Sequence, residues 1–230
     1  MCDHGRLSFG YTHENRLQKP KVHGKDASWK EARAAALELL SAPHSVALVS
    51  AWNTNEAMSA MKEFLNTEFP SIRIFGYANK TEADQTFPGF TISGDKNPNR
   101  AGLKQVLGVD PEASIQALAA ENAAIGTLFL VHNIPGFELT RELKAIMDRA
   151  QNVVLLDFAS GELLRYGNVA VALPTLTSFE KSGTFVNRQG IAQSFEPVME
   201  PVTYGMPETE IVAGLGTALR ATRPATGVLA

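Results

Sequence analysis

The sequence contains 230 residues, and its 44% hydrophobic content is sufficient to bury one large core or two small ones. A formal net charge of −3 and a pI near 6.0 argue against nucleic-acid binding, which requires a positive field. No apolar run reaches the roughly 18–20 residues that span a bilayer, so we expect no direct membrane insertion. Asp3, His4 and Arg6 argue against a signal peptide. A single cysteine, Cys2, favours a reducing, cytoplasmic compartment.

The sequence predicts an extended N-terminal arm at residues 1–27, followed by one domain at residues 28–230. The arm is rich in polar residues and shows no helical or strand period. Its large apolar side chains are too few to form a core of their own, yet more numerous than a solvating tail needs. We therefore expect the arm, extended or as a hairpin, to lie outside the core and to contact another chain.

From residue 28 onward, helical and strand patterns alternate. Ser28 is a suitable N-cap, and Glu31 completes a capping box ahead of an alanine-rich helix. Asn53 or Thr54 begins the next helix, which ends before Pro70. Further helices are predicted at residues 110–124, 140–150 and 208–221. Short apolar runs typical of buried strands lie at residues 46–51, 72–77, 127–131, 153–157 and 169–173.

This alternation predicts the fold class. Short strands separated by longer helices form right-handed βαβ units and a parallel sheet covered on both faces. We therefore expect an α/β fold with three layers, in which a mainly parallel sheet is flanked by helices. Residues 78–108 break the alternation because they are dense in Asn, Asp, Gly, Pro and Thr, and we expect an irregular loop there.

Two segments of the chain carry motifs. The first runs from the strand at residues 169–173 through Gln193, and its motif positions are Leu173, Pro174, Glu180, Lys181, Gly183, Thr184, Phe185, Val186, Asn187, Gly190 and Gln193. The second contains MetCysAspHisGlyArg at residues 1–6, Tyr11, Arg16 and SerTrpLysGluAla at residues 28–32. In this order they resemble the G subunit of NADH-quinone oxidoreductase (respiratory complex I), within the molybdopterin oxidoreductase family. Gln189 and Ile191 depart from the pattern, which usually has Glu and Arg there.

The resemblance implies two cofactors, a [4Fe-4S] cluster and molybdopterin. It makes Cys2 the last of four cluster ligands, so with one thiolate the chain could ligate only in trans, beside three cysteines of a neighbouring chain. The alternative is that Cys2 is an ordinary thiol. Molybdenum members usually carry Lys where this chain has His4. The resemblance also implies that Gly183, Thr184 and Asn187 belong to an inherited cofactor-binding motif.

The same resemblance identifies a reduced member of the family. Beyond Cys2 the chain has no cysteine that could bind molybdenum, and the central stretch that usually ends in Gly-x-Asn-Pro is missing. We therefore expect a short form that lacks the N-terminal iron–sulfur region, with no catalytic residues, no bound metal and no cofactor held by this chain alone.

Other candidate sites have simpler interpretations. The loop at residues 95–102 could contact a nucleotide, but Asn-Pro and Asn-Arg are also ordinary turn chemistry. His132 follows a strand at the edge where α/β sites lie, and we favour a turn histidine over a ligand. Glu180 and Lys181 could face a ligand, although a corner held by a local ion pair is the favoured interpretation. No Walker loop, dinucleotide fingerprint or nucleophile elbow is present.

Three functions remain open at this point. The first is an accessory, non-redox subunit of the peripheral arm of complex I, at the cytoplasmic face of the membrane, whose partners include a cysteine-rich iron–sulfur chain. The second is a pterin- or nucleotide-binding component of a formate-dehydrogenase-type oxidoreductase. The third is an independent module that binds a small ligand.

Overall fold

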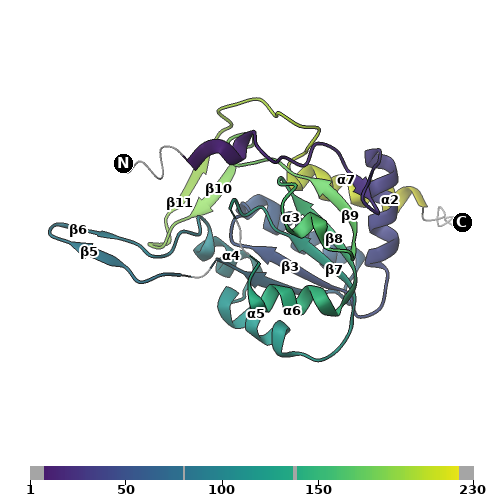
Figure 1. Cartoon of the computed structure of the whole chain (residues 1–230), viewed down its shortest axis with the longest axis horizontal. Coiled ribbons are helices and arrows are strands. Elements are labelled where there is room, and N and C mark those ends of the chain that lie inside the picture. Colours follow the sequence, from purple (N-terminus) through teal and green to yellow (C-terminus); the bar gives the residue numbers. More distant parts are fainter. Residues whose placement is uncertain (1–7, 80, 137–138, 223–230) are drawn as a thin grey trace, which may run out of the picture.

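A computed structural model describes residues 8–79, 81–136 and 139–222. Its centre is a mixed sheet in the order β2-β1-β9-β8-β7-β3-β4 (Figure 1), in which β1 (Lys21–Val22) and β2 (Lys25–Asp26) form the antiparallel end. The parallel strands are β3 (Val46–Ser50), β4 (Arg73–Tyr77), β7 (Ile125–Val131), β8 (Ala150–Asp157) and β9 (Val169–Pro174). Each lies within two or three residues of a predicted strand. The predicted α/β fold with a mainly parallel sheet is confirmed.

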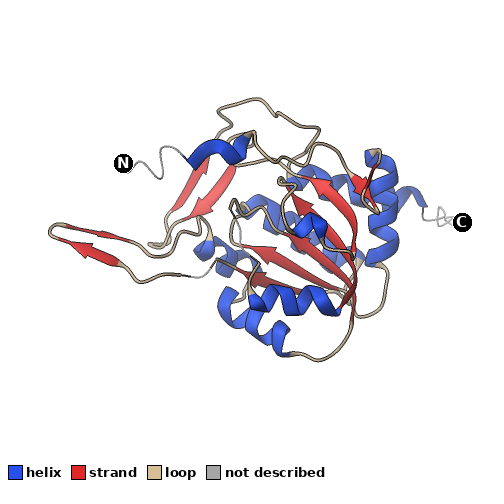
Figure 2. Cartoon of the chain, in the orientation of Figure 1, coloured by secondary structure: helices blue, strands red, loops and turns tan. Residues whose placement is uncertain are grey.

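Helices cover both faces of the sheet and complete three layers (Figure 2). One face packs against α2 (Trp29–Leu40), α3 (Asn55–Glu68), α4 (Arg100–Leu107) and α7 (Glu208–Thr222). The other packs against α5 (Pro111–Ala120) and α6 (Arg141–Arg149). Alternate residues of each strand serve opposite faces: Val49 belongs to the first core, whereas Leu48 belongs to the second. This two-sided burial explains why the strands are continuous apolar runs.

The predicted helix starts are confirmed by their caps. Ser28 and Glu31 form the capping box of α2, and Thr54 caps α3 through the N–H of Ala57. Asp110 caps α5, which ends at Ala120, four residues before the predicted end. Of the described helices, none is both long and apolar enough to cross a membrane.

The N-terminal arm contains a hairpin, which was one of its two predicted forms, but it does not lie outside the core. Residues 8–27 include a short 3-10 helix, η1 (Ser8–Thr12), and two strands, β1 (Lys21–Val22) and β2 (Lys25–Asp26). Strand β1 pairs antiparallel with β9 and extends the main sheet, while Leu17 is 1% exposed. The expectation that this segment lies outside the core is therefore wrong, because the strand pairing and the burial of Leu17 make it part of the domain.

Residues 78–108 also contain regular structure that the sequence did not predict. Strands β5 (Gln85–Phe87) and β6 (Phe90–Ile92) form a separate hairpin, and α4 follows it. A second hairpin, formed by β10 (Gly183–Val186) and β11 (Ala192–Phe195), contains the motif GlyThrPheValAsn. Both hairpins stand on the same side of the main sheet (Figure 1).

The strand order creates a switch point between β3 and β7. From β3 the chain moves outward to β4, and it later returns to build β7 on the other flank of β3. In open α/β sheets, ligands bind outside the carboxyl ends of the strands at such a point. A ligand site in this fold is therefore expected at the carboxyl edge of the sheet.

Candidate functional site at the carboxyl edge of the sheet

Buried polar side chains gather where the parallel strands end. They follow β3, β7, β8 and β9, and they are Ser50, Asn53, His132, Asn133, Asp157, Thr175 and Thr177. Each is at most 4% exposed. Burial of polar groups is costly unless they are hydrogen-bonded, so the contacts among them decide what this edge can do.

Asn133 is the centre of these contacts. It has a positive φ of 56°, which is uncommon for a residue with a side chain. Its amide nitrogen donates to Asn53 Oδ1 at 2.8 Å and to Glu208, and its amide oxygen accepts from Thr175. Glu208 also accepts from Lys181 Nζ at 2.6 Å, and both of those side chains are buried. One asparagine thus joins β3, β9 and the start of α7.

A second buried ion pair closes the same edge from the N-terminal segment. The Arg16 guanidinium donates to both carboxylate oxygens of Glu180, at 3.1 and 2.8 Å, and both side chains are 0% exposed. Glu180 also accepts hydrogen bonds from the backbone of Thr177 and Val202. Burial alone would raise the pKa of Glu180, but these donors outweigh it and hold that pKa below its ordinary value.

These contacts revise the predicted corner at residues 180–183. Glu180 and Lys181 do lie in a turn, but neither belongs to a local ion pair. Glu180 reaches Arg16 in the N-terminal segment, and Lys181 reaches Glu208 at the start of α7. The dipeptide therefore joins both ends of the described chain to the carboxyl edge.

A third group lies between β4, β7 and β8. The Tyr77 hydroxyl and His132 Nδ1 share a hydrogen bond of 2.5 Å, and their rings are stacked. Burial lowers the pKa of His132 to about 3, so the ring is neutral at physiological pH. Burial raises the pKa of Asp157 to about 7, despite hydrogen bonds from three backbone N–H groups and the charge of Arg16. Burial and the charge of Asp157 together raise the pKa of Tyr77 well above its ordinary value.

A cavity of about 310 Å³ lies beside this group. The ends of β7 and β8 form its floor, and Tyr11 and Glu14 of the N-terminal segment form part of its wall. Its ionisable lining consists of Tyr11, Glu14, His132, Asp157 and Glu162, and none of the described lining residues is Lys or Arg. The cavity therefore suits a neutral or cationic group better than an anion.

Molybdopterin, which the sequence resemblance implies, carries a phosphate, and the residues here do not fit it. Phosphates bind at helix N-termini and to arginine or lysine. Two helices begin at the switch point, α3 with Thr54 as its cap and α6 with Thr140 as its cap. The first turn of α6 contains the carboxylate of Glu142, which opposes an anion, and the N-terminus of α3 is covered. Strand β10 covers this position: a Cβ on Gly183 would lie 2.8 Å from Thr54 Cβ, and the N–H of Thr184 donates to Glu56 at 2.9 Å. The adjoining cavity presents carboxylates instead of cations.

The sequence-predicted site residues have structural contacts where the structure describes them. Gly183 allows β10 to approach Thr54, and the Thr184 hydroxyl contacts Ser194 at 3.2 Å. The Asn187 side chain accepts from the N–H groups of Gln189 and Ile191 and shapes the turn between β10 and β11. Cys2 and His4 lie outside the described residues. Within the described ranges, no group of three or more His, Cys, Asp or Glu side chains could hold a metal ion.

The loop at residues 95–102 combines local turn contacts with contacts to distant parts of the chain. The N–H of Asn97 donates to Asp95 Oδ1 at 3.0 Å, which is a turn contact. Asn97 donates to Asn79 O at 3.0 Å. Asn99 is fully buried and joins two elements, because its Oδ1 accepts from Val186 N at 2.7 Å and its Nδ2 donates to Asn53 O. Gly102 leaves room for the Asn99 side chain. These amides are occupied by the chain itself.

Sequence reasoning missed several residues of this edge. Asn133, Asp157 and Glu208 had no assigned role, although Asp157 ends a predicted strand and Asn133 follows His132 in the noted turn. Arg16 was noted only as a motif position, and Asn53 only as a possible helix cap. A charged or amide residue directly after a buried strand was the available signal. The sequence contains no signal for the pairings themselves, because the paired residues lie far apart in the chain.

Comparison with known proteins supports the fold and identifies the family. A chain of a crystal structure described as the formyltransferase/hydrolase complex (FhcABCD) from Methylorubrum extorquens in complex with methylofuran is similar, with a TM-score of 0.54 and 8% identity. The match covers 88% of this chain and 99% of that one, and it shows the fold alone. Acetylene hydratase from Pelobacter acetylenicus matches with a TM-score of 0.37 and 15% identity, over 75% of this chain and 20% of that one. No curated protein sequence matches.

The molybdopterin oxidoreductase family model matches residues 72–218, well over half of the chain, and the chain therefore belongs to the molybdopterin oxidoreductase family.

Proposed function

We propose that this chain is an accessory, non-redox subunit of a multi-subunit enzyme complex. The observation that carries the proposal is made at the carboxyl edge of the sheet, where buried polar groups pair within the chain and the described lining of the remaining cavity has carboxylates but no Lys or Arg. Asn133, Glu180 and Glu208 use the polar groups at this edge for contacts within the chain. The N-terminus of α3, where a phosphate would bind, lies under Gly183. A subunit built in this way contributes surface to an assembly and leaves cofactor chemistry to its partners.

The peripheral arm of NADH-quinone oxidoreductase is the first candidate assembly. Its support is the order of the two motif-bearing segments, with Cys2 and Arg16 at one end and Glu180 to Asn187 at the other. In this assembly the chain would lie at the cytoplasmic face of the membrane, and its neighbour would be a cysteine-rich iron–sulfur chain. Cys2 could then complete a cluster in trans. The buried Arg16–Glu180 pair connects the two segments and is consistent with their common origin.

A formyltransferase/hydrolase-type complex is the second candidate. One observation favours it: the likeness covers 99% of a chain in such a complex, so a polypeptide of comparable extent and fold occurs there. The pterin-binding alternative, a component of a formate-dehydrogenase-type enzyme, has weaker support because Glu14, Asp157 and Glu162 line the cavity at the carboxyl edge.

Affinity purification of the tagged chain from its native host tests the proposal. We expect the chain to elute in a stable, stoichiometric complex, in which mass spectrometry identifies either NADH-quinone oxidoreductase subunits or formyltransferase/hydrolase subunits. The subunits found decide between the two assemblies. A chain that elutes alone, with a catalytic activity of its own, would contradict the accessory role.

A further inference from the structure

The β5–β6 hairpin extends away from the body of the molecule (Figure 1). All six of its strand residues are exposed. Phe87 is 43% exposed, Phe90 is 59% exposed and Ile92 is 42% exposed. The two phenylalanine rings stack on each other with centroids 5.0 Å apart and contribute an aromatic surface near the tip. Residues 85–92 contain no charged side chain.

Such a hairpin is poorly suited to remain in water. An isolated two-stranded hairpin is at best marginally stable. Soluble proteins usually protect open strand edges with charged residues, or cover them, because unpaired backbone groups invite pairing with other chains. This hairpin has neither protection within the described chain. Exposed aromatic side chains of this kind mark interaction sites.

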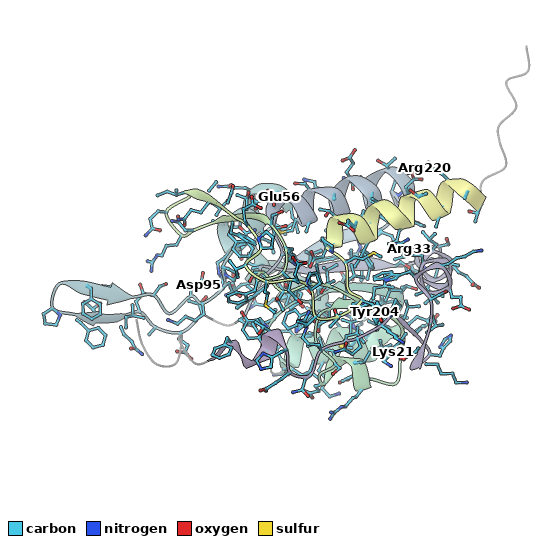
Figure 3. The ribbon with its side chains drawn as sticks, turned by 90° about the horizontal axis from the view of Figure 1, so that it is seen from above. Lys21, Arg33, Glu56, Asp95, Tyr204 and Arg220 are labelled. Carbon is cyan, nitrogen blue, oxygen red and sulfur yellow. The ribbon has the colours of Figure 1, made fainter. Side chains whose placement is uncertain are left out.

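The base of the hairpin borders an acidic groove of about 820 Å³. Its described lining includes four carboxylates, Asp84, Asp95, Glu112 and Glu142, and two arginines, Arg100 and Arg188. Figure 3 shows Asp95 where the hairpin joins the body.

Both arginines of this groove are already paired. Arg100 contacts Asp95 at 2.8 Å and also Glu112. Arg188 contacts Asp84 at 3.1 Å. The described side chains of the groove therefore have a net negative charge, and a complementary surface must be basic.

We propose that the β5–β6 hairpin is a docking arm for a different protein subunit, one that offers an apolar slot to Phe87 and Phe90 and a Lys/Arg rim to the acidic groove. The inference rests on the accessory-subunit function proposed above. The charge of the groove selects against a second copy of this chain, because a two-fold dimer built on this arm would place groove against groove. A stable interface buries roughly 800 Å² and involves roughly 20–30 residues on each partner. A hairpin of eight residues is too small to supply this by itself, so the groove must contribute contact area.

A photo-crosslinking experiment on the full chain tests the arm. The tagged chain is expressed in its native host with p-benzoylphenylalanine in place of Phe90 or, as a control, in place of Val198, which is 76% exposed on a different loop. We expect the probe at position 90 to cross-link to one non-identical subunit of the purified complex, at apolar residues flanked by Lys or Arg. The control probe should not cross-link to that site. A cross-link to a second copy of the chain, or equal cross-linking from both positions, would overturn the proposal.

The double variant Phe87→Ser/Phe90→Ser supplies a quantitative test. Loss of two interface anchors should weaken binding of that subunit by at least about 30-fold, which corresponds to a hot-spot effect of about 2 kcal/mol. Val198→Ser should leave binding unchanged. The melting temperature of the isolated double variant should remain that of the wild type, because the hairpin packs against little of the body.

The two proposals fail in different ways. If the wild-type chain purifies alone, the accessory function and the docking arm are both wrong. If the wild-type chain and the double variant recover the same complex in equal amounts, the accessory function holds and the docking arm is wrong.

Discussion

The carboxyl edge of the sheet and the β5–β6 hairpin reverse the usual distribution of residues. At the edge, charged side chains such as Arg16, Glu180 and Lys181 are buried. On the hairpin, Phe87 and Phe90 are exposed. In most folded domains charged groups face water and aromatic side chains are largely buried. The two reversals have different physical explanations.

At the edge, the cost of burying charge is offset within the chain. Arg16, Glu180 and Lys181 each have a partner of opposite sign in hydrogen-bond contact, so the structure already explains their burial. On the hairpin, the exposed rings of Phe87 and Phe90 stack on each other. The comparison therefore indicates that the carboxyl edge acts as a structural joint, whereas the hairpin and the groove beside it form the interaction surface that we propose.

The largest effect should follow from breaking the joint. Arg16→Met leaves Glu180 buried without its cation, and removal of one partner of a buried pair costs about 3–5 kcal/mol. The expected result is a loss of that size in the free energy of unfolding, measured by urea denaturation.

Arg73→Met is the matched control for this variant. Arg73 forms a two-bond pair with Glu121, but the Arg73 side chain is 56% exposed. Its loss should cost less than about 1 kcal/mol. Equal effects of the two substitutions would show that the Arg16–Glu180 pair is no more important than a surface pair.

A smaller effect should follow from separating β10 from α3. In Gly183→Ala, the added methyl group would collide with Thr54, whose Cβ would lie 2.8 Å away. Overpacking of this kind costs about 1–3 kcal/mol. Gly167→Ala is the control because nothing lies within 4 Å of the position that its added methyl group would take, and thermal unfolding of the two variants gives the comparison. A Gly183→Ala protein as stable as Gly167→Ala would mean that the cap of α3 is not tightly covered.

The pH dependence of the unfolding free energy should distinguish the contribution of Asp157 from that of His132. The pKa of Asp157 is raised from 3.8 to about 7, so its contribution to stability is full below pH 3.8 and is lost as pH rises to about 7. The pKa of His132 is lowered from 6.5 to about 3, so its contribution is full above pH 6.5 and is lost as pH falls to about 3. Between about pH 4 and 6.5 the two slopes oppose each other.

The substitution Asp157→Asn removes the contribution of Asp157 to the pH dependence of the unfolding free energy. Between pH 4 and 7, the unfolding free energy of the variant should rise relative to wild type by up to about 1.4 kcal/mol per pH unit. Urea denaturation of both proteins at several pH values measures the difference, in which the contribution of His132 cancels. A difference that does not change with pH would contradict the raised pKa of Asp157.

The smallest effect on stability is expected at the hairpin. Phe87→Ser/Phe90→Ser should change the unfolding free energy of the isolated chain by no more than about 0.5 kcal/mol per residue, as for other exposed positions. Calorimetry of the pure protein provides this value. A large loss of stability would show that the aromatic pair belongs to the fold and would remove the contrast between the two regions.

The sequence was most informative where burial is continuous. The five parallel strands were predicted in place because runs such as residues 127–131 are apolar on both faces. Helix α4 was missed because it has eight residues, contains Gly102 and follows an Asn-Pro turn. The hairpin was missed because its strands have three residues each and no buried face that would impose an alternating pattern.

The site could be predicted only in part. Its location after the strands followed from the fold class, and His132 was noted there for that reason. The contacts of Arg16 with Glu180, and of Asn133 with Glu208, join residues that are 164 and 75 positions apart. Nothing local in the chain specifies such pairs, since they depend on the tertiary approach of the N-terminal segment and α7 to the sheet.

The pterin content of the full chain shows whether the carboxyl edge of the sheet still holds the cofactor of the family. The protein would be produced in a host that synthesises molybdopterin and purified without denaturation, and its pterin would be quantified by fluorescence after oxidation, together with molybdenum and tungsten by elemental analysis. Asn133 contacts Glu208, Gly183 packs against Thr54, and the described lining of the cavity at this edge has no Lys or Arg for a phosphate. We therefore predict no stoichiometric pterin and neither metal. About one pterin per chain would contradict the account.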